Sequence, residues 1–190
     1  MTIAREIRIA GFGGSLRHGS YNNMLLKLCS MRMPEGSTLE ICNISRIPVY
    51  NPDNEENPGE AVKDFRKSLE SSNGILIVTP EYNYSIPGFI KNAIDSVSRP
   101  MDKNPFKGKP VAIMSASTGM LGGSRAQYHL RQVLQFLEAS TIQKPEIFIS
   151  FAGQKFTDNG ELKDEVAMKF IDELLTKLVT IAADEISRDI

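Results

Sequence analysis

The pattern of hydrophobic and polar residues along this chain switches repeatedly between one typical of strands and one typical of helices. Short, almost continuous apolar runs, such as GILIVTP at 74–80, have the length and β-branched content of strands that are covered on both faces. Between these runs, apolar residues recur every three or four positions, which is the spacing of an amphipathic helix. The alternation predicts strands at 6–12, 38–44, 74–80, 110–117 and 145–150, and helices at 21–32, 59–70, 87–98, 123–138 and 163–187.

The same patterns predict which helical side chains are buried and where one helix begins. The expected buried stripes are Met24, Leu25, Leu28 and Met31 in the first helix, and Val166, Phe170, Leu174, Leu178 and Ile181 in the last. Asn57 followed by Pro58 predicts the start of the 59–70 helix, because proline is favoured at the first helical position.

Strands that alternate with helices predict an α/β fold, a doubly wound five-stranded parallel sheet with helices on both faces. Right-handed crossovers favour the flavodoxin-like strand order 2-1-3-4-5. The 190 residues suit one domain that spans 1–190. In such a sheet, ligands bind beyond the carboxyl ends of the strands, next to the point where the strand order reverses. Here that point lies between the first and third strands.

The segment GFGGSLRHGSYNN, which follows the first strand, predicts a phosphate site. Two glycines let the backbone approach closely, and the free N–H groups of a helix start attract anions. Ser20 stands where a Walker loop needs lysine, and Leu16 stands where a dinucleotide fingerprint needs its third glycine. What remains are four candidate phosphate ligands: Ser15, Arg17, Ser20 and Asn22. An ordinary Gly-Ser loop with a serine N-cap is the alternative.

Two more loops with polar and aromatic residues follow the third and fourth predicted strands. The first reads PEYNYSIPG over 80–88, and the second reads SASTG over 115–119. Parallel strands bring their carboxyl ends to one edge, so these loops should lie beside the phosphate segment. The combination predicts a ligand with a phosphate tail and a flat polar ring.

Composition excludes several other classes of function. The 22 basic and 23 acidic residues give a net charge of −1, without the basic block that nucleic-acid binding requires. No apolar run reaches membrane-spanning length, so no membrane insertion is expected. Cys29 and Cys42 have no metal or redox spacing, and His18 and His129 are far apart, so we expect no metal site and a cytoplasmic protein.

Three motifs, GSLRHGSYN, PEYNYSIPGFIKNAIDSVSRP and SASTGMLGG, resemble the NADPH-dependent FMN reductase family, in particular its chromate and quinone reductase branch. The resemblance implies a bound FMN. By position, its phosphate would be held by Ser15, Arg17, Ser20 and Asn22. The flavin ring would lie along Pro80, Glu81, Tyr82 and Asn83, mainly against backbone groups, with Ser117 and Gly119 on its other side.

The resemblance also implies an activity. NADPH or NADH would donate a hydride to the flavin, which would then reduce quinones and similar small acceptors, including chromate and azo compounds, in ping-pong order. No catalytic side chain is needed. N–H groups near Gly119–Gly123, where the next helix starts, would stabilise the reduced flavin. Homodimers or homotetramers are expected, with Arg125 and Tyr128 as interface candidates and Arg99 reaching a neighbour's site.

Several alternatives remain open from the sequence. Free FMN could be a substrate, the protein could be a flavodoxin-type electron carrier, or it could be a phosphate-ester binding module. Tyr82 and Tyr84 either shape the open face of the ring or only pack their loop. Glu81 is either a solvated loop acid or a hydrogen-bond partner of backbone or of another subunit. His18 either contacts the phosphate or lies on the surface.

Overall fold

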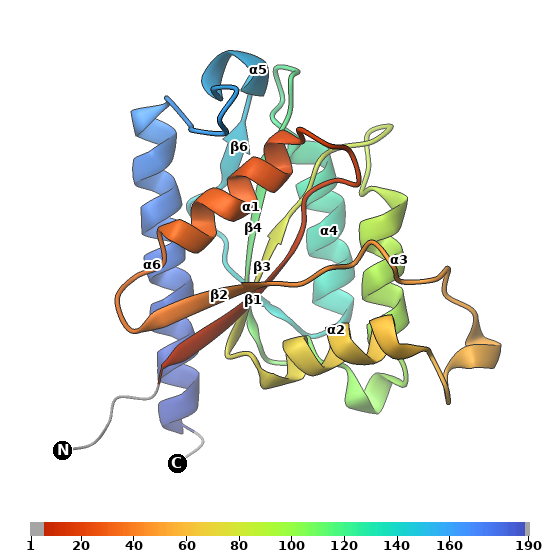
Figure 1. Ribbon diagram of the computed structural model, residues 1–190. Helices are drawn as coiled ribbons and strands as arrows, with labels where there is room; N and C mark the ends of the chain where they lie inside the picture. Colours follow the sequence, from red (N-terminus) through yellow and green to blue (C-terminus); the bar gives the residue numbers. More distant parts are fainter. Residues whose placement is uncertain (1–5, 189–190) are drawn as a thin grey trace.

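A computed structural model describes residues 6–188 and contains one twisted parallel sheet (Figure 1). Its strands are β1 (Ile7–Gly13), β2 (Ser37–Ile41), β3 (Gly74–Val78), β4 (Pro110–Ala116), β5 (Ser140–Thr141) and β6 (Ile147–Ile149). The order β2-β1-β3-β4-β5 confirms the predicted flavodoxin-like topology. β3 and β4 are buried along their whole length, as their continuous apolar runs predict.

The fifth position of the sheet is shared by two short strands. β5 pairs with Pro110 and Val111 at the start of β4, whereas β6 pairs with Met114–Ala116 at its end. The strand predicted at 145–150 is β6, and the sequence pattern missed β5. Between the two, Pro145 has no N–H to donate to a ladder, which explains why one continuous strand does not form here.

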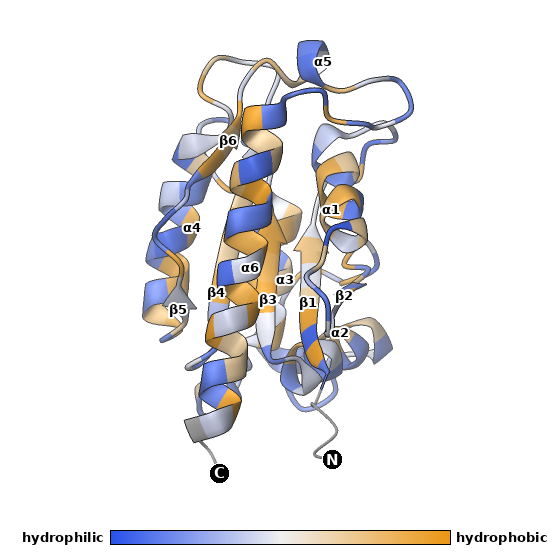
Figure 2. Ribbon diagram, turned by 90° about the vertical axis from the view of Figure 1, so that its left-hand side faces the viewer, coloured by the Kyte–Doolittle hydropathy of each residue, from blue (hydrophilic) through white to orange (hydrophobic). Residues whose placement is uncertain are grey.

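Helices cover both faces of the sheet, as predicted. The α-helices are α1 (Tyr21–Met31), α2 (Glu60–Ser71), α3 (Gly88–Val97), α4 (Ser124–Phe136), α5 (Ala152–Lys155) and α6 (Glu165–Arg188), and the 3₁₀ turns are η1 (Pro52–Asn54) and η2 (Met101–Lys103). Figures 1 and 2 show α1 and α6 on one face, and α2, α3 and α4 on the other. Within the described residues, no helix combines the length and the apolar character needed to span a bilayer.

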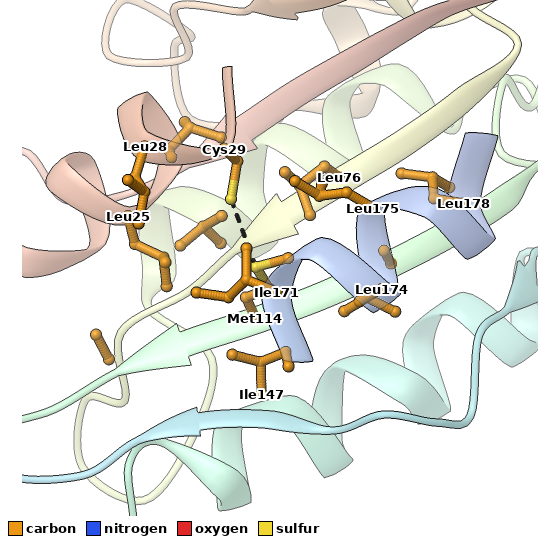
Figure 3. Close-up of a cluster of buried hydrophobic side chains, with 14 of the residues drawn as sticks. Leu25, Leu28, Cys29, Leu76, Met114, Ile147, Ile171, Leu174, Leu175 and Leu178 are labelled. Atoms are coloured by element: carbon orange, nitrogen blue, oxygen red, sulfur yellow. Dashed lines mark hydrogen bonds between the residues drawn. The ribbon is translucent and has the colours of Figure 1, made fainter. Parts of the chain in front are cut away.

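Each face of the sheet buries its own apolar cluster. On the α1/α6 face, Leu25 and Cys29 of α1 belong to one buried apolar cluster with Leu174 and Leu178 of α6 (Figure 3). The Cys29 thiol lies 3.6 Å from the Met114 sulfur. Burial raises the pKa of Cys29 to about 12, so this thiol stays protonated and unreactive at neutral pH.

On the opposite face the central side chain is Phe12. Its ring meets that of Phe65 edge-to-face, with the ring centres 4.9 Å apart, and lies 6.4 Å from the ring of Phe106. Phe12 is fully buried at the end of β1, so this aromatic cluster anchors the strand just before it enters the loop that follows.

Two predictions about the helices are wrong, namely part of the buried stripes of α1 and α6 and the start of α2. Val166 and Phe170 are 66% and 44% exposed, and Met31 is 68% exposed. The buried stripe of α6 runs through Ile171 and Leu178, and a helical period traced back from Ile171 reaches Ala167 and Met168, which pack on the core.

The start of α2 also differs from the prediction. Its N-cap is Gly59, with a φ of +83°, and the helix begins at Glu60. Asn57 and Pro58 lie outside the helix, where the Asn57 N–H donates to the Asn54 carbonyl in a turn after η1. The left-handed backbone at Gly59 separates this turn from the helix, so the pair cannot serve as its cap.

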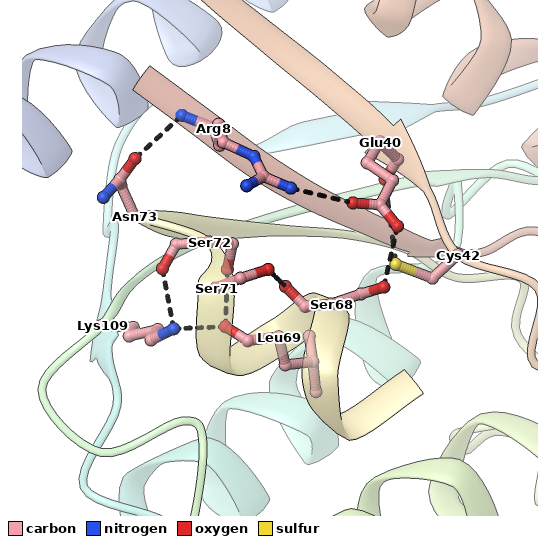
Figure 4. A network of polar contacts seen from close by, with 9 residues as sticks. All are labelled: Arg8, Glu40, Cys42, Ser68, Leu69, Ser71, Ser72, Asn73 and Lys109. Carbon is pink, nitrogen blue, oxygen red and sulfur yellow. Dashed lines mark hydrogen bonds and ion pairs between the residues drawn. The ribbon is translucent and has the colours of Figure 1, made fainter. Parts of the chain in front are cut away.

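Lys109 closes the other end of α2. Its ammonium group donates to the Leu69 carbonyl and to Ser72 O at 2.7 Å (Figure 4). It also donates to Glu70 O at 3.0 Å. Among the described residues, the Glu70 carbonyl has no helical N–H partner, whereas the Leu69 carbonyl also accepts from the Ser72 N–H. A cation at this end also suits the helix dipole. Burial lowers the pKa of Lys109 to about 8.

We expect Lys109→Met to lower the free energy of unfolding at pH 7 by about 1–3 kcal/mol, because the Glu70 and Ser72 carbonyls lose a charged donor. Between pH 8 and 10.5 an unfolded lysine keeps a proton that the folded Lys109 has lost, so the unfolded state binds more protons. The stability of the wild-type protein relative to the variant should therefore rise with pH in this window. Urea titrations at several pH values measure both effects.

The matched control is Lys107→Met, which removes an exposed lysine whose Nζ lies 3.0 Å from Glu138. It should cost less than about 1 kcal/mol. If the free energy of unfolding of the wild type relative to Lys109→Met falls from pH 8 to 10.5, the lowered pKa of Lys109 is contradicted.

Candidate functional site

Three loops leave the carboxyl ends of β1, β3 and β4 at the same edge of the sheet (Figure 1). We call residues 14–20 the first loop, 79–87 the second loop and 117–123 the third loop. All ten site residues predicted from the sequence lie in these loops or in the first turn of α1.

The first loop begins where β1 presses against β3. Gly13 has a φ of +120°, and a Cβ there would lie 2.0 Å from the Val78 carbonyl oxygen. The Gly14 N–H donates to the same oxygen at 2.6 Å. No side chain fits at Gly13, so glycine is required for the first and second loops to start side by side.

Asn23, which the sequence analysis missed, shapes the first loop. Its Oδ1 accepts from the Ser15 N–H at 2.9 Å, and its Nδ2 donates to the Ser15 carbonyl at 2.9 Å. The Ser15 hydroxyl accepts from the Arg17 N–H at 3.2 Å. A second asparagine directly after Asn22, at the third position of a helix, was the available sequence signal.

The first loop presents donors around the start of α1. Arg17 is exposed, and its Nη2 donates to the Gly19 carbonyl at 3.2 Å, which folds the guanidinium over the loop. Ser20 is the N-cap of α1 and accepts from the Asn23 N–H. Within residues 6–188, the backbone N–H groups without an acceptor here are those of Leu16, His18, Gly19, Ser20, Tyr21 and Asn22. Such a set of neutral donors at a helix start is suited to an anion.

The Asn22 side chain is bonded to backbone groups of the protein itself. Its Nδ2 donates to Ala116 O at 2.8 Å, and its Oδ1 accepts from Ala116 N at 2.9 Å. Asn22 is 4% exposed, so this is a buried clamp between α1 and the end of β4. The backbone N–H of Asn22 has no acceptor among the described residues, so it remains available to an anion.

The second loop contains a tight turn. Tyr82 and Ser85 exchange two backbone hydrogen bonds of 3.0 and 2.9 Å. The two central residues both have positive φ, 49° at Asn83 and 67° at Tyr84, which is rare for a bulky residue such as tyrosine. At the base of the loop, the buried Thr79 hydroxyl donates to the Pro80 carbonyl at 2.8 Å.

One side-chain contact joins the first and second loops. The Tyr82 hydroxyl lies 2.9 Å from the Ser15 hydroxyl, while the Tyr82 side chain remains about half exposed. Ser15 and Tyr82, predicted at opposite ends of one ligand, are therefore neighbours. Tyr82 borders the space above the first loop.

Glu81 is not a solvated acid. Its Oε2 accepts from the N–H groups of Arg125 and Ala126 at 3.1 and 3.4 Å, and its Oε1 lies 3.2 Å from Arg125 Nη1. Its side chain is 13% exposed. The interpretation as a partner of backbone groups is confirmed. Glu81 also occupies the N–H groups of Arg125 and Ala126 in the first turn of α4, so these two groups are not free to stabilise a ligand. They follow the Gly119–Gly123 segment, where ligand donors were predicted.

Buried side chains and a close backbone approach support the third loop. Gly122 and Gly123 have positive φ, and a Cβ at Gly122 would lie 2.7 Å from the Phe148 carbonyl carbon. The buried Ser115 hydroxyl donates to the Gly122 carbonyl at 2.6 Å and accepts from Gln127 Nε2 at 2.7 Å. Gln127 had no sequence signal, because one glutamine on a helix is usually exposed.

The exposed end of the third loop carries the two predicted ring contacts. The Ser117 hydroxyl accepts from the Gly119 N–H at 3.1 Å. Ser117 is partly exposed and Gly119 is exposed. The Gly119 carbonyl accepts from the Phe151 N–H at 3.2 Å, and the Ser117 carbonyl accepts from Ala152 N at 2.9 Å. The segment after β6 therefore supports this loop from outside.

The remaining candidates lie on the surface. His18 is exposed in the first loop, and His129 Nδ1 lies 2.9 Å from the Ser85 hydroxyl. Tyr128 is half exposed and meets Phe148 edge-to-face, and Arg99 is exposed after α3. Across residues 6–188, no group of three or more His, Cys, Asp or Glu side chains is arranged to hold a metal ion.

We expect Asn22→Leu to lower the free energy of unfolding by about 2–4 kcal/mol, because both Ala116 backbone groups lose buried partners. Chemical denaturation measures this loss. Asn159→Leu, at an exposed asparagine, is the matched control and should change stability by less than about 0.5 kcal/mol. Equal stability of the two variants would show that the clamp contributes nothing.

Comparisons with known proteins agree on one family. The family model of NADPH-dependent FMN reductases matches residues 7–154. An NAD(P)H-dependent FMN reductase of Pseudomonas aeruginosa is 45% identical over 177 residues, which cover 93% of this chain and 95% of the relative. A quinone reductase of Escherichia coli K12 is 38% identical over 179 residues, 92% of this chain and 94% of the relative.

A solved structure extends the agreement to three dimensions. FerB, a flavoenzyme NAD(P)H:(acceptor) oxidoreductase from Paracoccus denitrificans, superposes with a TM-score of 0.85 at 32% identity. The superposition covers 94% of this chain and 98% of FerB. The chain therefore belongs to the NADPH-dependent FMN reductase family and is an oxidoreductase that works with FMN and NAD(P)H.

Proposed function

We propose that this protein holds FMN as a bound prosthetic group in the three loops and uses it to pass electrons from NAD(P)H to quinones and similar small acceptors. One observation carries the proposal: a cluster of unpaired N–H groups at the start of α1 lies beside two loops with aromatic and glycine residues, all at one edge of the sheet. A phosphate with an attached flat ring matches that arrangement.

The first loop fits the phosphate end of FMN. Its free N–H groups come from the loop and the first turn of α1, and Arg17 adds a cation that lies on the surface of the same loop. The Ser15 and Ser20 hydroxyls supply further neutral donors. A phosphate dianion would receive charge-assisted hydrogen bonds, which are the stronger class.

The second and third loops fit the ring. Pro80, Tyr82 and Asn83 lie on the second loop, and Ser117 and Gly119 lie on the third, so they offer backbone groups from two sides. When bound, FMN takes a hydride from the nicotinamide and passes the electrons to the acceptor. The protein binds and orients the partners.

No cysteine takes part in this chemistry. Cys29 is buried, and burial raises the pKa of Cys42 to about 11, so neither thiol is ionised at neutral pH. A disulfide exchange mechanism is therefore not part of the proposal.

We also propose a homodimer or homotetramer in the cytoplasm. Exposed apolar side chains gather around the loops and the neighbouring α4: Tyr82, Tyr84, Met120, Leu121, Tyr128 and Phe151. Surface of this kind is usually covered by a partner. It supports an assembly in which a second copy lies close to the site.

Whether the protein retains FMN distinguishes an enzyme with a bound prosthetic group from one that uses free FMN as a substrate. Gel filtration of the yellow protein should leave flavin with the protein peak. Rapid reduction of that flavin by NAD(P)H alone would then set this protein apart from a flavodoxin-type carrier, which needs a partner protein to be reduced.

We expect Arg17→Ala to raise the dissociation constant of FMN by about 10- to 100-fold, because a hydrogen bond to a charged group contributes about 1.5–3 kcal/mol. Titration of the apoprotein followed by flavin fluorescence measures the constant. Lys169→Ala removes an exposed cation from α6 and should leave the dissociation constant of FMN unchanged. An unaltered constant in Arg17→Ala would remove Arg17 from the phosphate site.

Initial rates should fit a ping-pong scheme, because donor and acceptor would use the same open side of the ring in turn. Double-reciprocal plots at several quinone concentrations should be parallel. Lines that intersect would mean that both substrates are bound together, and would contradict the shared site.

A further inference from the structure

Glu81 makes three contacts with the start of α4, although it belongs to the loop after β3. Its two oxygens accept from Arg125 N, Ala126 N and Arg125 Nη1 at 3.1, 3.4 and 3.2 Å. A carboxylate at the first turn of a helix is in the position that the helix dipole favours. The contact joins the second loop to α4 across 44 residues of sequence.

Arg125 is held on its other side by Tyr84. The guanidinium carbon lies 3.6 Å from the centre of the Tyr84 ring. Tyr84 has a φ of 67°, a conformation that costs energy for a bulky residue and persists only where surrounding contacts hold it. The stacked guanidinium and the carboxylate together hold the turn that carries Tyr82 and Asn83.

The pair brings one negative and one positive charge to the contact between the second loop and α4. The Glu81 side chain is 13% exposed and that of Arg125 is 37% exposed, so solvent screens the carboxylate less than it screens a surface acid. The third loop ends at Gly123, directly before α4. Both loops that border the proposed ring site are therefore attached to this pair.

We propose that Glu81 and Arg125 each act through their charge on the reduction potential of the flavin, in opposite directions, so that the intact pair leaves the potential nearly unchanged. This inference rests on the proposed function. Reduction adds negative charge to the ring system, so the carboxylate disfavours it and the guanidinium favours it. With both present, the start of α4 contributes little net charge to the site.

The test is the midpoint potential of bound FMN in charge variants of the two residues. Glu81→Gln keeps an oxygen that can accept from the α4 N–H groups but removes the charge, so the potential should rise. Arg125→Gln should lower it. Each shift should correspond to about a three- to tenfold change in the reduction equilibrium, ~14–30 mV for a two-electron couple. Arg125→Lys and the double variant Glu81→Gln/Arg125→Gln should stay close to the wild type.

Shifts of the midpoint potential with opposite signs in the two single variants indicate an electrostatic role. Loosening of the loop would shift the potential of both single variants in the same direction. The matched control is the Arg32–Asp172 ion pair, which joins the C-terminal end of α1 to α6 at 2.5 Å. Arg32→Gln and Asp172→Asn should leave the potential unchanged. Shifts of the same sign, or no shift, in the Glu81 and Arg125 variants would overturn the inference while FMN binding stands. A wild-type protein that cannot bind FMN would overturn the proposed function and this inference together.

Discussion

The site depends on one close backbone approach, where β1 leaves the sheet. At Gly13 the chain turns with a positive φ so near to the Val78 carbonyl that no Cβ fits, and the next N–H donates to that same carbonyl. Val78 is also the last residue of β3. The phosphate-binding candidate and the ring-binding candidate therefore start from one shared contact. Phe12, packed between Phe65 and Phe106, fixes the strand that brings Gly13 there.

The sequence predicts features that repeat or that lie close together along the chain. Continuous apolar runs give β3 and β4, and a glycine pair before a polar helix start gives the first loop. Contacts between distant residues leave no such pattern. The clamp from Asn22 to Ala116 spans 94 residues, and Gln127 looks like a surface residue until α4 is packed on the sheet. Even Asn22, chosen as a phosphate ligand for its residue type, is bonded to the protein itself.

The start of α4 differs from the start of α1 for a specific physical reason. A helix start near a ligand site is expected to offer free N–H groups, but in the first turn of α4 those of Arg125 and Ala126 are taken by one of the protein's own acids. Glu81 comes from another loop, and its carboxylate is a better acceptor for those N–H groups than a neutral group would be. α1 has no acidic residue in its first turn, so its N–H groups stay available. The two helix starts at this edge thus differ in what they can bind.

That difference suits an enzyme that must both receive and release electrons. A free helix start beside the ring would stabilise the added negative charge, which would ease reduction by the nicotinamide and hinder transfer to the acceptor. A helix start closed by Glu81 and balanced by Arg125 would avoid favouring either half-reaction strongly. The open start of α1, by contrast, lies at the proposed phosphate site, and the charge of the phosphate does not change during turnover. In the proposed arrangement, strong electrostatic binding would anchor the cofactor, and the net charge would be weak where the chemistry takes place.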